Sequence, residues 1–573
     1  MLLSLGHGQK VVSFKSPSAP GIAQESRVLP DSVPAALAAG LAEPPTLDAG
    51  EGRFGYLFPT APGPGRPIGA AVLDLLGDAM IDQGARPDLD AIAPIHTYFG
   101  QFIDHDITAN TDRDIPGVGG QLTIDQATLN PVQRDLVVAA VTNLRNATLR
   151  LDSLYGDGPV ATGLEAAMRD GARMRLGELS PGPNFHTPVT PPNDGLADLP
   201  RVGTLVKAGI INAADVPAAL LSGGTAAESR KALIGDARND ENLVVAQFHV
   251  AFLRFHNAVL DAQGGGDSPE AFADAQKLVR HIYQWLVINA YLPAIADKTV
   301  VDAVIAGAAP IYGRFYDSLK NQIAPGELPM PLEFSVAAFR YGHSLIRARY
   351  DYNQNFTGSA AATFEQLFQF TGNDPVAPIG GPIAAAPTLP NNWPIDWNRF
   401  LGRAGDPPFR FARAIDTALA PPLSEMVNQG AGVFRHLAKR NLRRGWLMNI
   451  PSAQSVATAL TAAGHPPARV LTEAEIMDGA IASSTLPAEE KVKFAQSTPL
   501  WFYVLKEAEK INDGRRLGPI GSRLVAETLV GLVVNDPESY WRLDAGGGSW
   551  SPTVGAQKIE SMEDMLKFAG VLN

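Results

Sequence analysis

Apolar residues recur at helical spacing through most of the chain after residue 70, whereas the strict alternation typical of strands is rare. In the segment 239–263, for example, Leu243, Phe252 and Leu260 recur at helical spacing. Long stretches rich in proline and glycine interrupt this periodicity, notably 156–202 and 371–396. The pattern predicts a mainly α fold with long loops.

The predicted helices are spread along the chain beyond residue 130. They span residues 131–151, 239–263, 269–292, 333–349, 411–440, 452–463, 472–481, 496–511 and 520–534. No internal repeat and no clear linker divides the sequence, and 573 residues suffice for a large core. We therefore expect one large domain, residues 71–573, preceded by an extended Pro/Gly-rich N-terminal arm, residues 1–70, laid over its surface.

Composition excludes several kinds of chemistry. There is no cysteine, so disulfides, thiolate ligands, iron–sulfur clusters and cysteine nucleophiles are ruled out. The net charge of −12 argues against nucleic acid as a partner. A mean hydropathy of −0.01 and the lack of a long apolar run predict a soluble protein without an integral membrane segment. No Sec-type signal is visible, so we expect a cytoplasmic protein or export by a non-Sec route, with the oligomeric state left open.

One segment concentrates polar groups within a helical pattern: HTYFGQFIDHD, residues 96–106. In a helix, Gln101 and His105 are one turn apart and share a face, while Asp104 and Asp106 point elsewhere. A histidine flanked by carboxylates suits acid–base chemistry near neutral pH. The alternative is a buried structural histidine whose ring is satisfied by a carbonyl group.

Three further polar segments follow along the chain: GDARNDE (235–241), AFRYGHSL (338–345) and RNLRRGWLMNIPS (440–452). Each alone has an ordinary structural explanation. Arg238 suits a helix end, Glu241 suits the first turn of the following helix, and His343 suits a core position. The RNLRR run suits a solvated basic face.

Together, and in this order, the four segments resemble the peroxidase–cyclooxygenase superfamily, the animal-type haem peroxidases. GQFIDHD (100–106) is similar to the distal-histidine motif, RNDE (238–241) to Arg-x-x-Glu, AFRYGH (338–343) to the proximal-histidine motif and RNLRRG…IPSAQ (440–454) to the Asn-bearing segment. The stretch 517–532 is similar to bacterial members. The resemblance covers most of residues 70–540 and implies the large single-domain haem peroxidase fold.

The resemblance implies haem b as the cofactor. His343 would be the proximal ligand of the haem iron, with Asn441 as the hydrogen-bond partner of its other ring nitrogen. Arg340 and Arg444 would pair with the anionic propionates.

On the opposite face of the haem, the resemblance assigns three catalytic residues. His105 would carry the peroxide proton, and Arg238 would stabilise the developing negative charge. Gln101 would hold the distal water or a halide. Asp104 and Glu241 match positions that form ester bonds to the haem in relatives, so at least partial covalent attachment is expected. Asn242 replaces a methionine, which excludes a sulfonium bond.

A calcium site is less well matched. Asp106 corresponds to one calcium ligand of the family, and the loop 145–156 corresponds to the others, but Arg150 replaces a carboxylate. We expect the Arg150 guanidinium to fill the site and pair with Asp106 or Asp152. The alternative is a calcium ion held by the remaining oxygens.

The predicted activity is a haem-dependent peroxidase that reduces hydrogen peroxide through an oxoferryl intermediate. It would oxidise small donors, either halide or thiocyanate or phenolic and aromatic compounds, and would act in the response to oxidative stress. A fatty-acid dioxygenase of the same superfamily is one alternative. Its tyrosine, three residues before the proximal histidine, is here Arg340, and Tyr341 would face away from His343. A non-catalytic haem-binding or adhesion member is the other. The remaining histidines, including His249, are expected to serve packing.

Overall fold

The computed structural model describes residues 52–573 except 85–87, 110–121, 157–162, 223, 373–385, 427–428 and 545–548. Before residue 52 it describes only two short strands, β1 (Leu2–Leu3) and β2 (Val12–Ser13), which pair antiparallel. Most of the predicted arm 1–70 and the segment examined for an export signal therefore lie outside the described residues.

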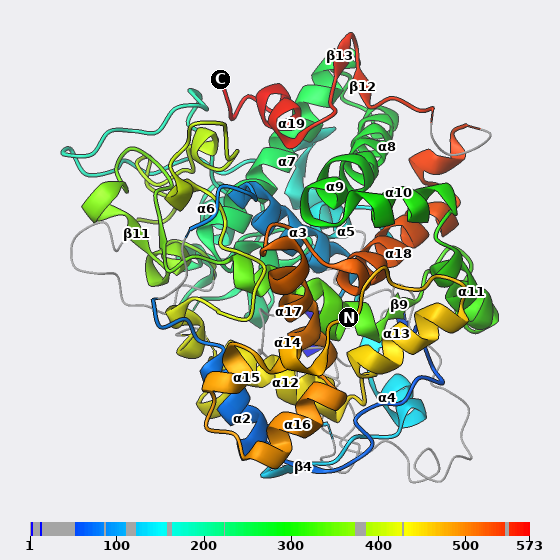
Figure 1. Ribbon diagram of the computed structural model, residues 1–573. Helices are drawn as coiled ribbons and strands as arrows, with labels where there is room; N and C mark the ends of the chain where they lie inside the picture. The colour runs from blue at the N-terminus through cyan, green and yellow to red at the C-terminus, as the bar shows by residue number, and fades with distance from the viewer. Residues whose placement is uncertain are drawn as a thin grey trace.

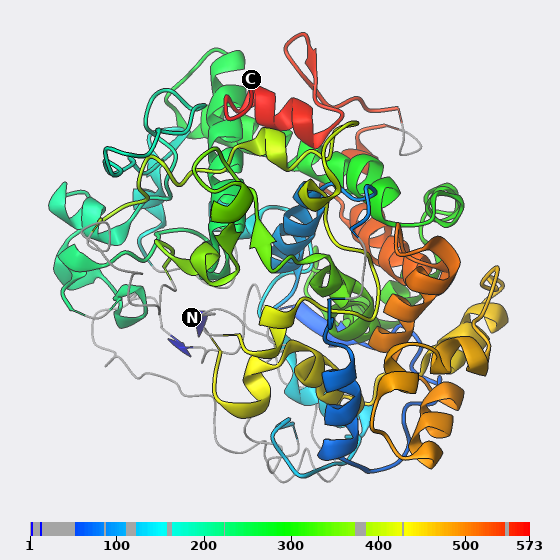
Figure 2. The same ribbon diagram turned by 60° about the vertical axis from the view of Figure 1, so that its left-hand side comes forward.

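Helices dominate the described chain, as predicted. They are α2 (Ala70–Ala79), α3 (Pro94–Ile107), α4 (Arg134–Ala140), α5 (Asp152–Tyr155), α6 (Val202–Lys207), α7 (Leu243–Ala262), α8 (Pro269–Leu286), α9 (Leu292–Ile295), α10 (Lys298–Ala306), α11 (Pro310–Leu319), α12 (Leu437–Leu447), α13 (Ala453–Ala462), α14 (Glu473–Met477), α15 (Ala480–Ser483), α16 (Ala488–Gln496), α17 (Leu500–Asn512), α18 (Pro519–Asn535) and α19 (Met562–Phe568). In Figure 2 the loop-rich part between α5 and α7 and the helices α13–α18 lie on opposite sides of the molecule.

The strands are short and pair into small sheets. They are β3 (Gly52–Gly55), β4 (Ile68–Gly69), β5 (Thr128–Leu129), β6 (Thr142–Asn143), β7 (Arg169–Asp170), β8 (Arg173–Met174), β9 (Met330–Pro331), β10 (Arg349–Tyr350), β11 (Ala362–Thr363), β12 (Thr553–Val554) and β13 (Gln557–Lys558). The described three-stranded sheet has the order β6-β3-β9, with β3 antiparallel to β6 and parallel to β9.

Helix α3 lies near the centre of the molecule, beside α7 (Figure 1). Phe102 on α3 stacks on Phe252 of α7 with ring centroids 5.0 Å apart, and Tyr283 of α8 meets both rings edge-on. Such aromatic pairs add to the free energy gained by burying their surface. This cluster fixes α3, and with it the polar segment 96–106, against the core.

Helix α7 is long and apolar enough to span a membrane by length and composition, with a mean hydropathy of 1.3. However, 83% of this window is buried inside the protein, so α7 is a core helix. Its N-terminus is capped by Asn242, whose side chain accepts a hydrogen bond from the backbone N–H of Val245 at 3.1 Å.

The described part of the predicted arm, residues 52–70, packs into the body rather than lying only on its surface. Phe54 is completely buried, and β3 is held between β6 and β9. The buried carboxylate of Glu333 accepts hydrogen bonds from the backbone N–H groups of Leu57 and Phe58 at 2.8 and 3.0 Å. The boundary at residue 70 stays a prediction.

Two predicted helices are largely wrong. The segment 131–151 contains only α4 before the chain turns into β6, where Asn143 donates a hydrogen bond to the carbonyl of Ile107. The segment 411–440 contains two short 3₁₀ turns (Pro421–Ser424 and Gly432–Arg435) and the start of α12. Consecutive prolines and nearby glycines interrupt α-helix there, although the apolar spacing looked helical.

The proximal segment is helical but not α-helical. Residues Glu333–Ala337 (η8) form a π-turn, and Ala338–Leu345 (η9) form a 3₁₀-helix. In a 3₁₀-helix residues three apart are eclipsed, so Arg340 and His343 share a face. The predicted helix 269–292 likewise ends as α8 at Leu286, followed by a π-turn (η6, Val287–Tyr291).

A candidate haem cavity

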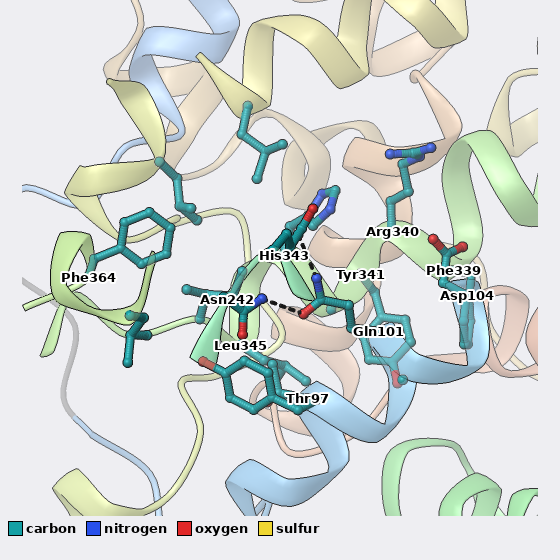
Figure 3. Close-up of a pocket in the computed structure, with 18 of the residues that line it drawn as sticks. Thr97, Gln101, Asp104, Asn242, Phe339, Arg340, Tyr341, His343, Leu345 and Phe364 are labelled. Carbon is teal, nitrogen blue, oxygen red and sulfur yellow. Dashed lines mark hydrogen bonds between the residues drawn. The ribbon is translucent and has the colours of Figure 1, made fainter. Parts of the chain in front are cut away.

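A cavity of about 950 Å³, part of it open to solvent, lies between α3 and η9. Figure 3 shows Gln101 and Asp104 entering from α3, and Arg340, Tyr341 and His343 from η9. Helix α12 contributes Leu437 and Arg440 to the lining. Three segments that are distant in the sequence and were singled out there thus meet around one space.

His343 is oriented by its neighbour Asn441. The side-chain amide of Asn441 lies 2.9 Å from Nδ1 of His343. With Oδ1 of Asn441 turned towards the ring, Nδ1–H of His343 donates to it. In that tautomer the lone pair lies on Nε2, the nitrogen through which an imidazole binds a metal.

Two arginines line the cavity, but only one of them was predicted. Arg340 lines it as expected, and its Nε donates to the carbonyl of Ser335 at 2.9 Å. Arg444 is not part of the lining: it lies one turn further along α12 and donates to the carbonyl of Leu122. Arg440 takes its place on the cavity wall. Sequence reasoning had no signal to choose between two arginines on the same helix face.

Gln101 belongs to a hydrogen-bonded group on the α3 side. Its Nε2 donates to Glu241 Oε1 at 2.8 Å, and its Oε1 accepts from Asn242 Nδ2 at 3.3 Å. All three residues line the cavity (Figure 3 draws Gln101 and Asn242). Asn242 therefore orients Gln101 as well as capping α7.

The two carboxylates predicted to form ester bonds both reach the cavity. Asp104 and Glu241 line it, and the Thr108 hydroxyl donates to Asp104 Oδ1 at 2.8 Å. Asp104 lies one turn after Gly100 and two turns after Thr97, so these three residues form the stripe of α3 that faces the cavity.

His105 lies at the edge of this stripe and is completely buried, so it borders the cavity without lining it. Its Nδ1 is 2.9 Å from Asn239 Oδ1, in the short 3₁₀ turn η5 (Ala237–Asp240) before α7. The helical spacing predicted that Gln101 and His105 share a face and that Asp104 points elsewhere, but Gln101 and Asp104 line the cavity, and the His105 ring is directed towards η5.

Arg238 lies beside His105 but does not line the cavity. Its Nη2 donates to the carbonyl of His105 at 2.8 Å, and its guanidinium pairs with Asp236 at 2.7 Å. Arg145 pairs with the same carboxylate. Burial would raise the pKa of Asp236, but the two arginines more than offset this and lower it. Arg145, Arg238 and Asp236 together carry a net positive charge behind the cavity wall.

The prediction for Arg150 is wrong. Its guanidinium pairs with Asp536 at 2.6 Å and with Glu538 at 3.3 Å, not with Asp106 or Asp152, because two carboxylates after α18 attract it outwards. Asp106 instead accepts hydrogen bonds from the backbone N–H groups of Leu151 and Ser153.

The loop that corresponds to a calcium site keeps several oxygens available. Among the described residues, Asn146 Oδ1, Thr148 Oγ1 and Ser153 Oγ are buried without a hydrogen-bond partner. No group of three or more His, Cys, Asp or Glu side chains suited to a metal occurs in the described chain. The loop therefore offers mostly neutral oxygens, which hard cations also accept.

Two tyrosines also line the cavity, and sequence reasoning missed one of them, Tyr291. Tyr291 and Tyr341 both line it, and their hydroxyls lie 2.7 Å apart. Burial, together with the neighbouring Tyr291, raises the pKa of Tyr341 well above its ordinary value, so it stays protonated. As predicted from the spacing, Tyr341 and His343 point in different directions (Figure 3). Tyr291 had no motif to reveal it.

The cavity fits a haem by its chemistry. One wall presents an imidazole whose Nδ1 is already engaged, and the two arginines suit anionic propionates. The rest is largely apolar, as a porphyrin requires, and includes Phe364, Leu367, Phe368, Leu423 and Met426. Tight apolar walls also exclude water from the porphyrin faces.

Comparisons with known proteins agree with this assignment. Residues 213–373 match the family model described as animal haem peroxidase. The chain is 30% identical over 118 residues to "Peroxidasin homolog pxn-2" of Caenorhabditis elegans, covering 20% of this chain and 8% of that protein. It is 25% identical over 285 residues to "Peroxidase-like protein" of Margaritifera margaritifera, covering 47% of this chain and 34% of that protein. The matches thus span a minor part of these curated relatives.

Solved structures show the same fold. Peroxidase A from Dictyostelium discoideum aligns with a TM-score of 0.52 at 16% identity, over 91% of this chain and 93% of that chain. The fatty acid alpha-dioxygenase of Oryza sativa aligns with a TM-score of 0.50 at 12% identity, over 88% and 78%. The chain has the mainly helical fold of the animal-type haem peroxidases, and its residues 213–373 match the animal haem peroxidase family.

Proposed function

We propose that this chain is a haem peroxidase that reduces hydrogen peroxide and oxidises a small donor. The observation that carries the proposal is the pairing of His343 Nδ1 with Asn441 in the wall of a cavity that faces Gln101. A histidine that served packing alone would not need to face a cavity lined by Gln101, Arg340 and Arg440. The match of residues 213–373 to the animal haem peroxidase family supports the same activity.

In this proposal His343 holds the haem iron through Nε2, and Arg340 and Arg440 hold the propionates. Asp104 and Glu241 are positioned to attach to the haem edge. The bound haem supplies the redox chemistry, taking oxidising equivalents from peroxide and passing them to the donor. Arg340 and Arg440 also replace the solvation that the propionates lose on entering the cavity.

Residues of the chain itself transfer the proton of the peroxide in this proposal. Peroxide must lose a proton from one oxygen and gain it on the other before its O–O bond breaks, and we assign this transfer to Nε2 of His105. Because His105 is completely buried, a proton held there is shielded from bulk water. The net positive charge of the cluster formed by Arg145, Asp236 and Arg238 favours the anionic form of the peroxide beside it.

The lining favours aromatic donors over halide. Phe364, Phe368 and Met426 place apolar surface around the space, which suits a phenol better than a hydrated anion. Small phenols and aromatic amines are therefore the first donors to test, with bromide and thiocyanate as comparisons.

The test begins with the absorption spectrum of the purified protein before and after peroxide, followed by phenol oxidation. His343→Ala should lose haem. His105→Ala should retain haem yet react with peroxide ~10²–10⁴-fold more slowly, the usual contribution of a positioned acid–base group. A colourless wild-type protein, or undiminished peroxide reaction in His105→Ala, contradicts the proposal.

A fatty-acid dioxygenase is the second candidate, because two hydrogen-bonded tyrosines line the cavity and its apolar wall suits an acyl chain. Dioxygenase activity requires oxygen uptake with a fatty acid and needs no stoichiometric peroxide. Oxygen consumption with palmitate that is abolished in Tyr341→Phe would favour this candidate over the peroxidase.

A further inference from the structure

Behind the Gln101 face, the side chain of Asn239 lies between two imidazoles. Its Oδ1 is 2.9 Å from Nδ1 of His105, and its Nδ2 is 3.1 Å from Nδ1 of His249 on α7. All three side chains are completely buried. Water therefore cannot substitute for either hydrogen bond.

An amide has one accepting side and one donating side, which ties the two histidines together. The imidazole that faces the oxygen must carry a proton on Nδ1, and the imidazole that faces the nitrogen must present a lone pair there. His105 and His249 are therefore held in opposite tautomers. In the orientation of the structure, His105 carries its proton on Nδ1 and has its lone pair on Nε2.

His249 can hold the Asn239 amide in place without itself taking up a proton. Burial lowers its pKa to about 3, although the charge of Asp236 opposes this, so it stays neutral at ordinary pH. Among the described residues, its Nε2 has no hydrogen-bond partner. His249 thus offers Nδ1 to Asn239, while nothing described competes for its other nitrogen.

This orientation of the Asn239 amide also stays compatible with His105 when the histidine is protonated. When His105 takes up a proton at Nε2, both of its nitrogens become donors, and only an amide that presents its oxygen can stay bonded to Nδ1. An amide turned the other way would face a donor with a donor. The observed arrangement is therefore the one that accepts a proton without rearrangement.

We propose that Asn239 and His249 are positioning residues that fix His105 as the Nδ1–H tautomer, so that Nε2 is the proton acceptor. This inference rests on the proposed peroxidase function. The charged groups around His105 are Asp104 and Asp106 on its own helix, Asp236 and Arg238 before α7, and Arg145 on the neighbouring loop. Their charges are common to both tautomers, whereas the amide distinguishes between them.

The test uses the haem-loaded protein and cyanide, which arrives as HCN and must give its proton to the distal base on binding. Asn239→Leu should slow cyanide association about 10–100-fold, the usual effect of losing an outer hydrogen-bond partner. Asn239→Asp keeps an oxygen towards His105 and should restore the rate to within about threefold of wild type. His249→Phe should give an intermediate rate.

His256→Phe is the matched control, because His256 is another buried histidine on α7 but bonds to Tyr155 and to the carbonyl of Ala172. It should leave cyanide association unchanged even if the melting temperature falls. Wild-type rates in Asn239→Leu, or equal slowing in the Leu and Asp variants, would overturn the positioning role. Failure of the wild type to bind haem would instead overturn the proposed function.

Nitrogen-15 spectra of labelled histidines give a readout independent of rate. In the diamagnetic carbon monoxide complex of the ferrous protein, long-range correlations distinguish Nδ1–H from Nε2–H. We expect His105 as Nδ1–H and His249 as Nε2–H, with signals assigned by loss in His105→Gln and His249→Phe. Both histidines in the same tautomer, or His105 protonated on Nε2 alone, would falsify the inference.

Discussion

Three asparagine side chains orient the polar groups around the cavity. Asn441 contacts His343, Asn242 contacts Gln101 and Asn239 contacts His105, each at 3.3 Å or less. An amide offers a donor and an acceptor without bringing a charge into a buried region, which avoids the desolvation penalty of a carboxylate. These three contacts orient polar groups with neutral side chains, beside charged groups that include Glu241, which also binds Gln101.

Covalent attachment of the haem is the first prediction at this scale. Because Asp104 and Glu241 both line the cavity, wild-type protein should retain at least part of its haem after acidic organic extraction under denaturing conditions. The double variant Asp104→Asn/Glu241→Gln should release all of it, since amides do not form these esters. Asp317→Asn, at an exposed position, is the control. Complete release from wild type would refute ester formation.

The buried histidines predict loss of stability in acid. Burial lowers the pKa of His249 from 6.5 to about 3 and that of His96 to about 4. The unfolded chain binds these protons below pH 6.5 and the folded chain does not, so their stabilising contribution is present above pH 6.5 and falls away towards pH 4. Between pH 7.5 and 5, His249→Phe should lose about 2 kcal/mol less stability than wild type. Equal losses in denaturant titrations at the two pH values would contradict this.

The sequence identified which residues belong to the site better than it predicted where each side chain lies. The motifs identified Gln101, Asp104, Glu241, Arg340 and His343, all of which line the cavity. They did not show that His105 lies behind the cavity wall, nor that Arg440 rather than Arg444 lines the cavity. Those outcomes depend on the rotation of a helix about its axis, which apolar spacing defines only to within part of a turn.

At the scale of elements, the cavity depends on a close approach between α3 and η6. A Cβ on Gly100 would lie 2.4 Å from the hydroxyl oxygen of Tyr291, so only glycine lets the π-turn reach the helix. The sequence predicted α3 and α7 well because both bury an apolar stripe. It could not predict the π-turns and the 3₁₀ segment η9, because their apolar spacing is close to that of an α-helix.

Substitution of this glycine should therefore be costly. Gly100→Ala should destabilise the protein by about 1–3 kcal/mol, as overpacking does, and displace Tyr291. Gly313→Ala is the control, since a Cβ there meets nothing within 4 Å in helix α11. It should be neutral or stabilising by up to about 1 kcal/mol. Thermal melting compares the two, and similar melting temperatures would argue against the close contact.

At the scale of the whole molecule, the segment after residue 51 ties distant parts together. Strand β3 pairs with β6 and β9, and Glu333 in the π-turn before η9 binds the backbone just after β3. The Pro/Gly-rich composition predicted an extended chain there but not its burial. Pairing between residues almost 280 apart leaves no local signal in the sequence.

Loss of this tie should affect the entire fold. Glu333→Ala leaves two buried backbone N–H groups without their acceptor, at roughly 1–3 kcal/mol each. We expect a lower melting temperature and faster proteolysis near residues 59–67. Glu489→Ala, at an exposed position, is the control and should change neither. Unchanged proteolysis in Glu333→Ala would show that the strand pairing alone holds the segment.

The parallel pairing of β3 with β9 has a consequence during synthesis. A ribosome releases β3 long before residues 330–331 exist, and the last wall of the cavity, α12, follows about a hundred residues later still. Strand β3 can pair with β6 early but must wait for its parallel partner β9 until more than half of the protein has been made. Under the proposed function, the porphyrin would enter only after α12 has been made, late in biogenesis.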